Sequence, residues 1–168
     1  MSALLRLVYD PAAPADRKRE AEGELRALAR TDAALEWALQ TLNAGTSDIQ
    51  ALFYACTVAD AAAAVRWLAL DPRQQAALRA CLWRGATDPA QPHFVRAKLA
   101  TSLAHTACLD WPADFWPGLQ ACLADSPRLE AGVDLLTATL DHFHSLAQAT
   151  SFGMRGKVGG EVGRALVF

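Results

Sequence analysis

The chain has 168 residues, of which 52% are hydrophobic, and a formal net charge of -2. This charge leaves no excess of cationic side chains for a nucleic-acid backbone or an anionic membrane surface, so proteins are the expected partners. The longest purely aliphatic stretch, 61–65, lies between Asp60 and Arg66, far short of the roughly 20 apolar residues of a membrane span. Residues 1–9 lack the length and cleavage site of a signal peptide, which favours an intracellular protein without membrane insertion.

The cysteines lie far apart, without a CxxC pair, at Cys56, Cys81, Cys108 and Cys122. Such spacing suits neither a zinc site nor a disulfide framework. We expect these side chains to be small, buried and hydrophobic. The sequence therefore predicts no metal and no other cofactor.

Helical spacing of apolar residues begins after a short apolar lead-in. The segment 14–30 carries Ala21, Leu25 and Leu28 at that spacing, with acidic residues in its first turn. A second helix is expected over 32–43, because Thr31 and Asp32 can cap it and an Asn-Ala-Gly sequence follows it. These two helices are predicted to form a hairpin.

A longer helix is predicted from Ser47 to Leu70, with an apolar stripe that ends at Trp67. Asp71 is a suitable N-cap for the next helix, over 72–84, because its carboxylate can accept hydrogen bonds from the free amides of the first turn. Proline suits the first position of this helix, because it has no amide proton to leave unpaired. Gly85 is expected to end that helix. The sequence thus predicts a long helix followed by a shorter one.

The same order recurs in the second half of the chain. Residues 94–107 predict a long helix, Trp111 and Pro112 interrupt it, and apolar residues at 115–123 predict a shorter one. A further long helix starts at Leu129. The tryptophans near helix ends, Trp67, Trp111 and Trp116, are expected to pack between neighbouring hairpins.

Paired helices that recur at roughly 40 residues are typical of HEAT and armadillo repeats, in which each hairpin buries its apolar face by stacking on its neighbours. We therefore predict an all-α, HEAT-like α-solenoid of three to four stacked antiparallel hairpins over residues 1–145. Five of the ten glycines lie within 153–163, and the chain ends in an apolar run. The segment 146–168 is interpreted as the truncated start of a next repeat.

Two pairs of residues could take part in metal binding or catalysis. His142 and His144 are two residues apart, so on a helix they point in nearly opposite directions and cannot share one metal ion. Ser102 and His105 could touch on a helix, but no nucleophile elbow or orienting acid accompanies them. The sequence therefore predicts that the protein is not an enzyme.

Two stretches resemble a known family. The charged run 16–22 (DRKREAE) resembles the start of the N-terminal domains of importin-β and the exportins. More specifically, 94–99 (FVRAKL) resembles the VRNKL motif of exportins, with Ala97 in the place of asparagine, and a Trp-Pro pair follows at the family's distance. The matching residues are Val95, Arg96, Lys98, Leu99, Trp111 and Pro112.

The resemblance implies the N-terminal region of a karyopherin-β nuclear transport receptor that shuttles between nucleus and cytoplasm. Its expected partners are the small GTPase Ran in its GTP form and a protein cargo, with nucleoporins as further candidates. Three stretches, 16–20, 67–70 and 92–96, look most like the exportins that carry actin bound to profilin. A HEAT-repeat scaffold for protein interactions that does not depend on Ran remains the alternative.

In that family the second helix of each hairpin lies on the concave side and helps to bind Ran. Here the corresponding helices would be 32–43, 72–84 and 112–124. Polar residues on their faces opposite the apolar stripes are candidates by geometry alone. They are Glu36, Gln40, Arg73, Arg79 and Arg84.

Overall fold

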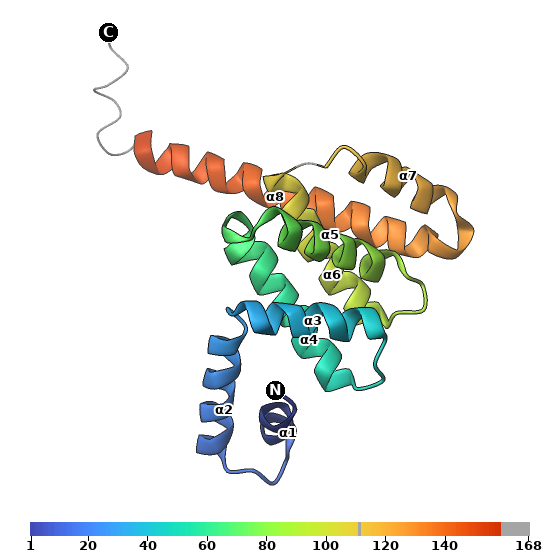
Figure 1. The fold of residues 1–168 in the computed structure, drawn as a ribbon. Coiled ribbons are helices and arrows are strands. Elements are labelled where there is room, and N and C mark those ends of the chain that lie inside the picture. Colours follow the sequence, from blue (N-terminus) through green and yellow to red (C-terminus); the bar gives the residue numbers. More distant parts are fainter. Residues whose placement is uncertain (111, 159–168) are drawn as a thin grey trace.

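The computed structural model describes residues 1–110 and 112–158, and within them all regular structure is helical. The all-α prediction is confirmed. The α-helices are α1 (Ser2–Tyr9), α2 (Ala15–Leu28), α3 (Asp32–Ala44), α4 (Ile49–Ala61), α5 (Pro72–Thr87), α6 (His93–Leu109), α7 (Phe115–Ala124) and α8 (Leu129–Val158) (Figure 1). A π-helical turn (Ala62–Arg66) and a 3-10 turn (Trp67–Ala69) continue α4, and a 3-10 turn (Ser126–Arg128) precedes α8.

Side-chain caps begin several of these helices. Thr31 accepts a hydrogen bond from the amide of Ala34 at 3.2 Å, and Asp48 accepts from two amides at the start of α4. Asp71 and Gln74 form a reciprocal capping box before α5, with proline in the first turn. Each cap pairs amide protons that have no partner inside the helix, which explains why the predicted starts agree closely with the observed ones.

The helices pack in neighbouring pairs, α1 with α2, α3 with α4, α5 with α6, and α7 with α8 (Figure 1). The predicted hairpins were therefore wrong by one element, because the apolar lead-in is itself helix α1. Gly45, with its left-handed φ of 66°, reverses the chain between α3 and α4. The short link between α2 and α3 instead turns a corner, so these two helices make little contact.

Helix α6 lies at the centre and packs against α4, α5 and α8. Val95, Leu99 and Leu103 on α6 are almost completely buried and join one core cluster that runs from Leu5 to Leu135. Small residues such as alanine cover much of the remaining surface of α6 and let its neighbours approach closely. Packing of α6 against helices on several sides therefore holds the pairs together.

Two details of the prediction need correction. Gly85 does not end α5, which continues to Thr87, because this glycine faces Leu99 of α6 and provides room for close packing rather than a turn. Trp67 is buried as expected, but Trp116 is 49% exposed, because the preceding Phe115 occupies the buried position on α7. Trp111 lies outside the described residues.

The segment Ile49–Ala69 is long and apolar enough to cross a membrane by length and composition, although half of its apolar window is buried inside the protein. At the other end, α8 continues through residue 146, where the glycine-rich segment was expected to begin. Exposed apolar side chains on α8 include Leu129, Val133 and Leu140. The apolar end of the chain, within 159–168, lies outside the described residues.

Candidate functional site

The five candidate residues lie on two helices that pack against each other, α3 and α5. Four of their side chains are exposed, and Gln40 donates a hydrogen bond to Glu36 at 3.4 Å on α3. The exposed arginines of α5 are Arg73 and Arg84. The structure therefore leaves these four residues accessible to a partner.

Arg79 differs from the other four, because its side chain is only 26% exposed and is already paired. Its Nη2 lies 2.7 Å from the Asp110 carboxylate, and its guanidinium carbon lies 5.1 Å from the centroid of the Trp67 ring. An ion pair and a cation–π contact thus join Arg79 of α5 to the end of α6 and to the 3-10 turn that follows α4. We therefore assign Arg79 a structural role in the site and not the role of a side chain that is free to contact a partner.

A groove of about 850 Å³ lies between α5 and α7. Its apolar lining includes Trp83 and Phe115, whose rings meet edge to face with centroids 5.7 Å apart. Leu103 of the central helix also lines it. Volumes of a few hundred to about 1,000 Å³ are typical of ligand-binding clefts. This groove is larger than a second one near the N-terminus.

The charged side chains at the groove nearly balance once the carboxylate partners at its edge are counted. Arg79, Arg84 and Arg128 line it, against a single acidic residue, Asp114. Arg128 pairs with Asp125 beside the groove, whereas Arg84 makes no ion pair or hydrogen bond among the described residues. The groove therefore combines an apolar floor with at least one arginine that is free to bind an anion.

Gly118 explains how α7 can support this floor. A methyl group at this position would lie 2.5 Å from Cζ2 of Trp83, too close for any carbon atom. Only glycine lets the indole ring rest directly on the backbone of α7. Sequence reasoning missed Trp83, Gly118 and Arg128, because nothing in their local pattern shows that α5 and α7 face each other across a groove.

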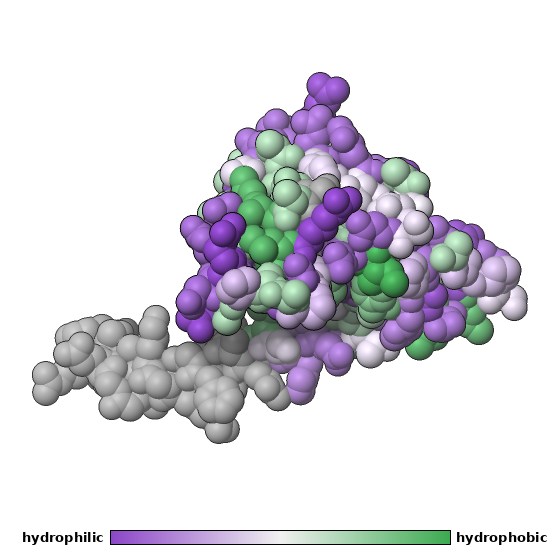
Figure 2. Space-filling model, turned by 90° about the horizontal axis from the view of Figure 1, so that it is seen from below, coloured by the Kyte–Doolittle hydropathy of each residue, from purple (hydrophilic) through white to green (hydrophobic). Residues whose placement is uncertain are grey.

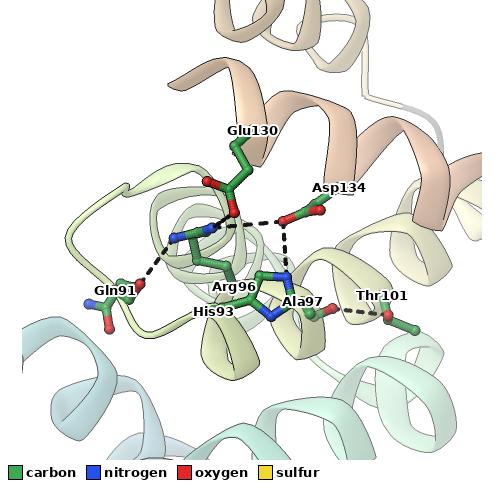
Figure 3. Close-up of polar contacts among 7 residues, drawn as sticks. All are labelled: Gln91, His93, Arg96, Ala97, Thr101, Glu130 and Asp134. Atoms are coloured by element: carbon green, nitrogen blue, oxygen red, sulfur yellow. Dashed lines mark hydrogen bonds and ion pairs between the residues drawn. The ribbon is translucent and has the colours of Figure 1, made fainter. Parts of the chain in front are cut away.

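Three residues of the exportin-like motif, Val95, Arg96 and Leu99, lie inside the fold. Val95 and Leu99 are completely buried, and the Arg96 side chain is only 9% exposed. Arg96 pairs with Glu130 of α8 at 2.7 Å and donates to the backbone carbonyl of Gln91 (Figure 3). Pro112 contributes to the groove lining, and Trp111 lies outside the described residues. The motif thus anchors α6 to its neighbours.

Lys98 extends this anchoring to α4. Its ammonium group lies 2.8 Å from one oxygen of Asp60, and the hydroxyl of Ser102 donates to the other oxygen at 2.8 Å. The serine hydroxyl therefore donates to Asp60 on the neighbouring helix or to the Lys98 carbonyl 3.1 Å away, and neither contact joins it to His105. His105 instead meets His142 of α8 edge to face, with ring centroids 4.7 Å apart. No catalytic arrangement follows from these contacts.

His93, Glu130 and Asp134 bring three potential metal ligands within 4.8 Å of one another. Arg96, however, lies between the two acids, 2.7 Å from Glu130 and 3.9 Å from Asp134 (Figure 3). Its positive charge already neutralises the carboxylates and repels a cation. The geometry fits an ion-pair network between α6 and α8 better than a metal centre.

A second, smaller groove of about 430 Å³ lies between α1, α2 and α4. Leu5, Tyr9 and Phe53 line it, and Phe53 is 54% exposed. Figure 2 views the molecule from this end and shows apolar side chains at the surface among polar ones. Phe53 is exposed in this groove because α1 and α2 do not close over it.

Comparison with known proteins does not assign the site. No family model matches the chain, and neither a curated protein nor a solved structure matches it significantly.

Proposed function

We propose that this chain belongs to a nuclear transport receptor, in which the helix pairs form part of a HEAT-like α-solenoid that binds Ran-GTP and a protein cargo. The exportin-like motif 94–99 supports this proposal at the level of sequence. The observation that carries it is the exposure of Glu36, Gln40, Arg73 and Arg84 on the adjacent helices α3 and α5.

The proposed mechanism is reversible binding without covalent chemistry. Arginines on one helical surface can make several charge-assisted contacts with an acidic protein surface. Ran-GTP and cargo would each favour a particular curvature of the helical stack, so that binding of one changes the affinity for the other. Loss of Ran after GTP hydrolysis would then release the cargo.

Calorimetric titration with Ran loaded with GTP or GDP tests this proposal. We expect the GTP form to bind at least about tenfold more tightly, the range of an ordinary allosteric coupling. The double variant Arg73→Glu/Arg84→Glu should weaken that binding, because both arginines are exposed on the proposed face and would repel an acidic surface after the change. Arg19→Glu is the matched control, since Arg19 is 76% exposed on α2, away from α3 and α5.

The alternative is a helical-repeat scaffold that does not depend on Ran. One observation favours it, namely that Arg96 and Lys98 of the exportin-like motif are both engaged in ion pairs between helices of this chain. Ion pairs of this kind would stabilise any stack of helices, whether or not it binds Ran. Equal binding of both nucleotide forms of Ran, or no effect of the double variant, would count against the transport receptor and in favour of the scaffold.

A further inference from the structure

We infer that an apolar stripe on α8 binds the same stripe of a second copy of this chain, so that the two helices form an antiparallel pair. The stripe lies on a side of α8 different from the one that packs on the core. Its members are Leu129, Val133, Leu136, Leu140 and Phe143. The inference does not depend on the proposed function, because it concerns a helix outside the proposed Ran-binding face.

The spacing of the stripe specifies a helix as its partner. Successive members are four, three, four and three residues apart, which is the spacing of the interlocking positions in coiled coils. Four of the five side chains are between 45% and 60% exposed, and Leu136 is half-buried. The core side of α8 differs, because Leu135 and Thr139 are almost completely buried there. An apolar face with this period packs best against a helix that has the same period.

The stripe is complementary to itself when two copies run in opposite directions. About a two-fold axis at the level of Ala138, Val133 of each copy lies opposite Phe143 of the other. Leu136 of each copy then lies opposite Leu140 of the other. A large ring thus meets a smaller side chain in the two outer layers, and leucine meets leucine in the two inner ones. Every layer of the pair is therefore filled by an apolar contact.

Polar residues at the edge of the stripe select the same direction. In the antiparallel pair Glu130 of each copy comes close to His144 of the other, and symmetry makes this contact twice. An imidazole can donate a hydrogen bond to a carboxylate, and its protonated form adds ionic attraction. Glu130 is exposed, and its ion pair with Arg96 uses the oxygen Oε1, so the carboxylate can accept a second donor. A parallel pair would instead place Thr139 beside His144, without an acid.

The course of α8 makes the stripe accessible. The helix continues past the other helices of the chain (Figure 1), and residues 143–147 are exposed. In the antiparallel pair this projecting part of each copy lies along the first turns of α8 in the other. The exposed halves of the two stripes therefore cover each other.

Helix α8 also supplies matched variants. Leu140, His144 and Ser145 are all exposed, and glutamate at any one of them adds an acid to the same helix. Leu140 lies within the stripe, His144 lies at its edge, and Ser145 lies on nearly the opposite side of the helix. Glutamate at Ser145 is therefore the control for added charge on α8.

The experiment measures the mass of the full chain by sedimentation equilibrium between about 1 and 100 μM, where interfaces of modest quality associate. We expect a reversible dimer. Leu140→Glu should weaken it at least about tenfold, because two carboxylates would be buried between the helices. His144→Glu should weaken it about tenfold, because each new acid would face Glu130 of the other copy. Ser145→Glu should change it by no more than about twofold.

Two results would overturn the self-association itself, namely a monomer at every concentration or equal losses in Leu140→Glu and Ser145→Glu. A dimer that His144→Glu leaves unchanged would contradict the antiparallel direction and so the pairing inferred here. Circular dichroism at the same concentrations controls for folding. If Leu140→Glu disturbs the fold, the comparison of His144→Glu with Ser145→Glu still decides, since both positions are exposed and outside the core.

Discussion

Arg96 of α6 and Glu130 of α8 form an ion pair of 2.7 Å in which the arginine is 9% exposed and the glutamate 73% exposed. The pair therefore joins a buried guanidinium to a carboxylate at the surface (Figure 3). Asp134 lies 3.9 Å from the same guanidinium and adds a second negative charge. Burial of this arginine depends on both acids, because an unpaired guanidinium in the interior is costly.

Because Arg96 is buried and Lys98 is not, we predict that these two cationic residues of the exportin-like motif contribute unequally to stability. Arg96→Ala should lower the free energy of unfolding by about 2 kcal/mol or more, since it removes charge-assisted hydrogen bonds and a buried side chain. Lys98→Ala should cost about 1 kcal/mol or less, because this side chain is 45% exposed and exposed ion pairs contribute little.

Urea unfolding monitored by circular dichroism measures both values. Arg19→Ala is a suitable control, because Arg19 forms an ion pair that is exposed on both sides. Equal losses in Arg96→Ala and Lys98→Ala would show that the buried pair between α6 and α8 does not stabilise the protein more than the exposed pair between α6 and α4 does.

The sequence predicted the parts of the fold that depend on local signals. Caps such as Thr31 and Asp71 identify helix starts directly, because the side chain that pairs the free amides lies within three residues of them. The pairing of helices was missed, since it depends on whether residues 1–9 form a helix, and eight residues carry too weak a periodicity to decide.

The candidate site was predicted less completely, because its residues come together only in the fold. Arg79 was selected as a surface residue, yet its partner Asp110 lies 31 residues away in the chain. Arg84 and Arg128 line one groove from different elements. A helical wheel of α5 shows which side chains face away from the core, but it does not show what α7 places opposite them.

Two glycines in helices should respond in opposite ways to alanine. A methyl group added at Gly23 in α2 would have no neighbouring atom within 4 Å, so Gly23→Ala should stabilise the protein by about 0.8 kcal/mol through helix propensity. At Gly85 the methyl would lie 2.3 Å from Cδ1 of the completely buried Leu99. Gly85→Ala should therefore cost about 1–3 kcal/mol, the range for overpacking a core.

Thermal unfolding of the two single variants tests this pair. The expected result is a higher melting temperature for Gly23→Ala and a lower one for Gly85→Ala. A compensating variant, Gly85→Ala/Leu99→Ala, removes the colliding side chain but opens a cavity, so it should not restore full stability. A stabilised Gly85→Ala single variant would contradict the close packing of α5 against α6.

The cysteines should differ in reactivity in the folded protein. Burial raises the pKa of both Cys56 and Cys81 to about 11, so very little reactive thiolate is present at neutral pH. Cys108 is only half-buried, and burial raises its pKa as well. We expect iodoacetamide to modify Cys108 before Cys56 or Cys81, because the reagent can reach it.

Mass spectrometry of proteolytic peptides after timed labelling measures the order. Labelling in urea provides the control, since all four thiols should then react at similar rates. Modification of Cys56 or Cys81 as fast as Cys108 under native conditions would mean that the core around α4 and α5 opens readily.

The contact between His105 and His142 should make stability depend on pH. Burial, and secondly the charge of His105, lower the pKa of His142 below its usual value of 6.5. The folded protein therefore favours neutral His142, whereas the unfolded chain binds a proton more readily. Stability from this group is fully present above pH 6.5 and decreases as the pH falls below that value.

We expect His142→Asn to reduce this dependence. The free energy of unfolding of the native protein and of the variant should be compared between about pH 7.5 and pH 5, because carboxylates contribute equally to both curves and cancel in the difference. The difference should shift in favour of the variant as the pH falls. The charged group that acts on His142 is His105 on α6, so His105→Asn should give a smaller change in the same direction, because the burial of His142 remains. A difference that stays constant with pH would mean that His142 titrates in the folded protein as it does in the unfolded chain.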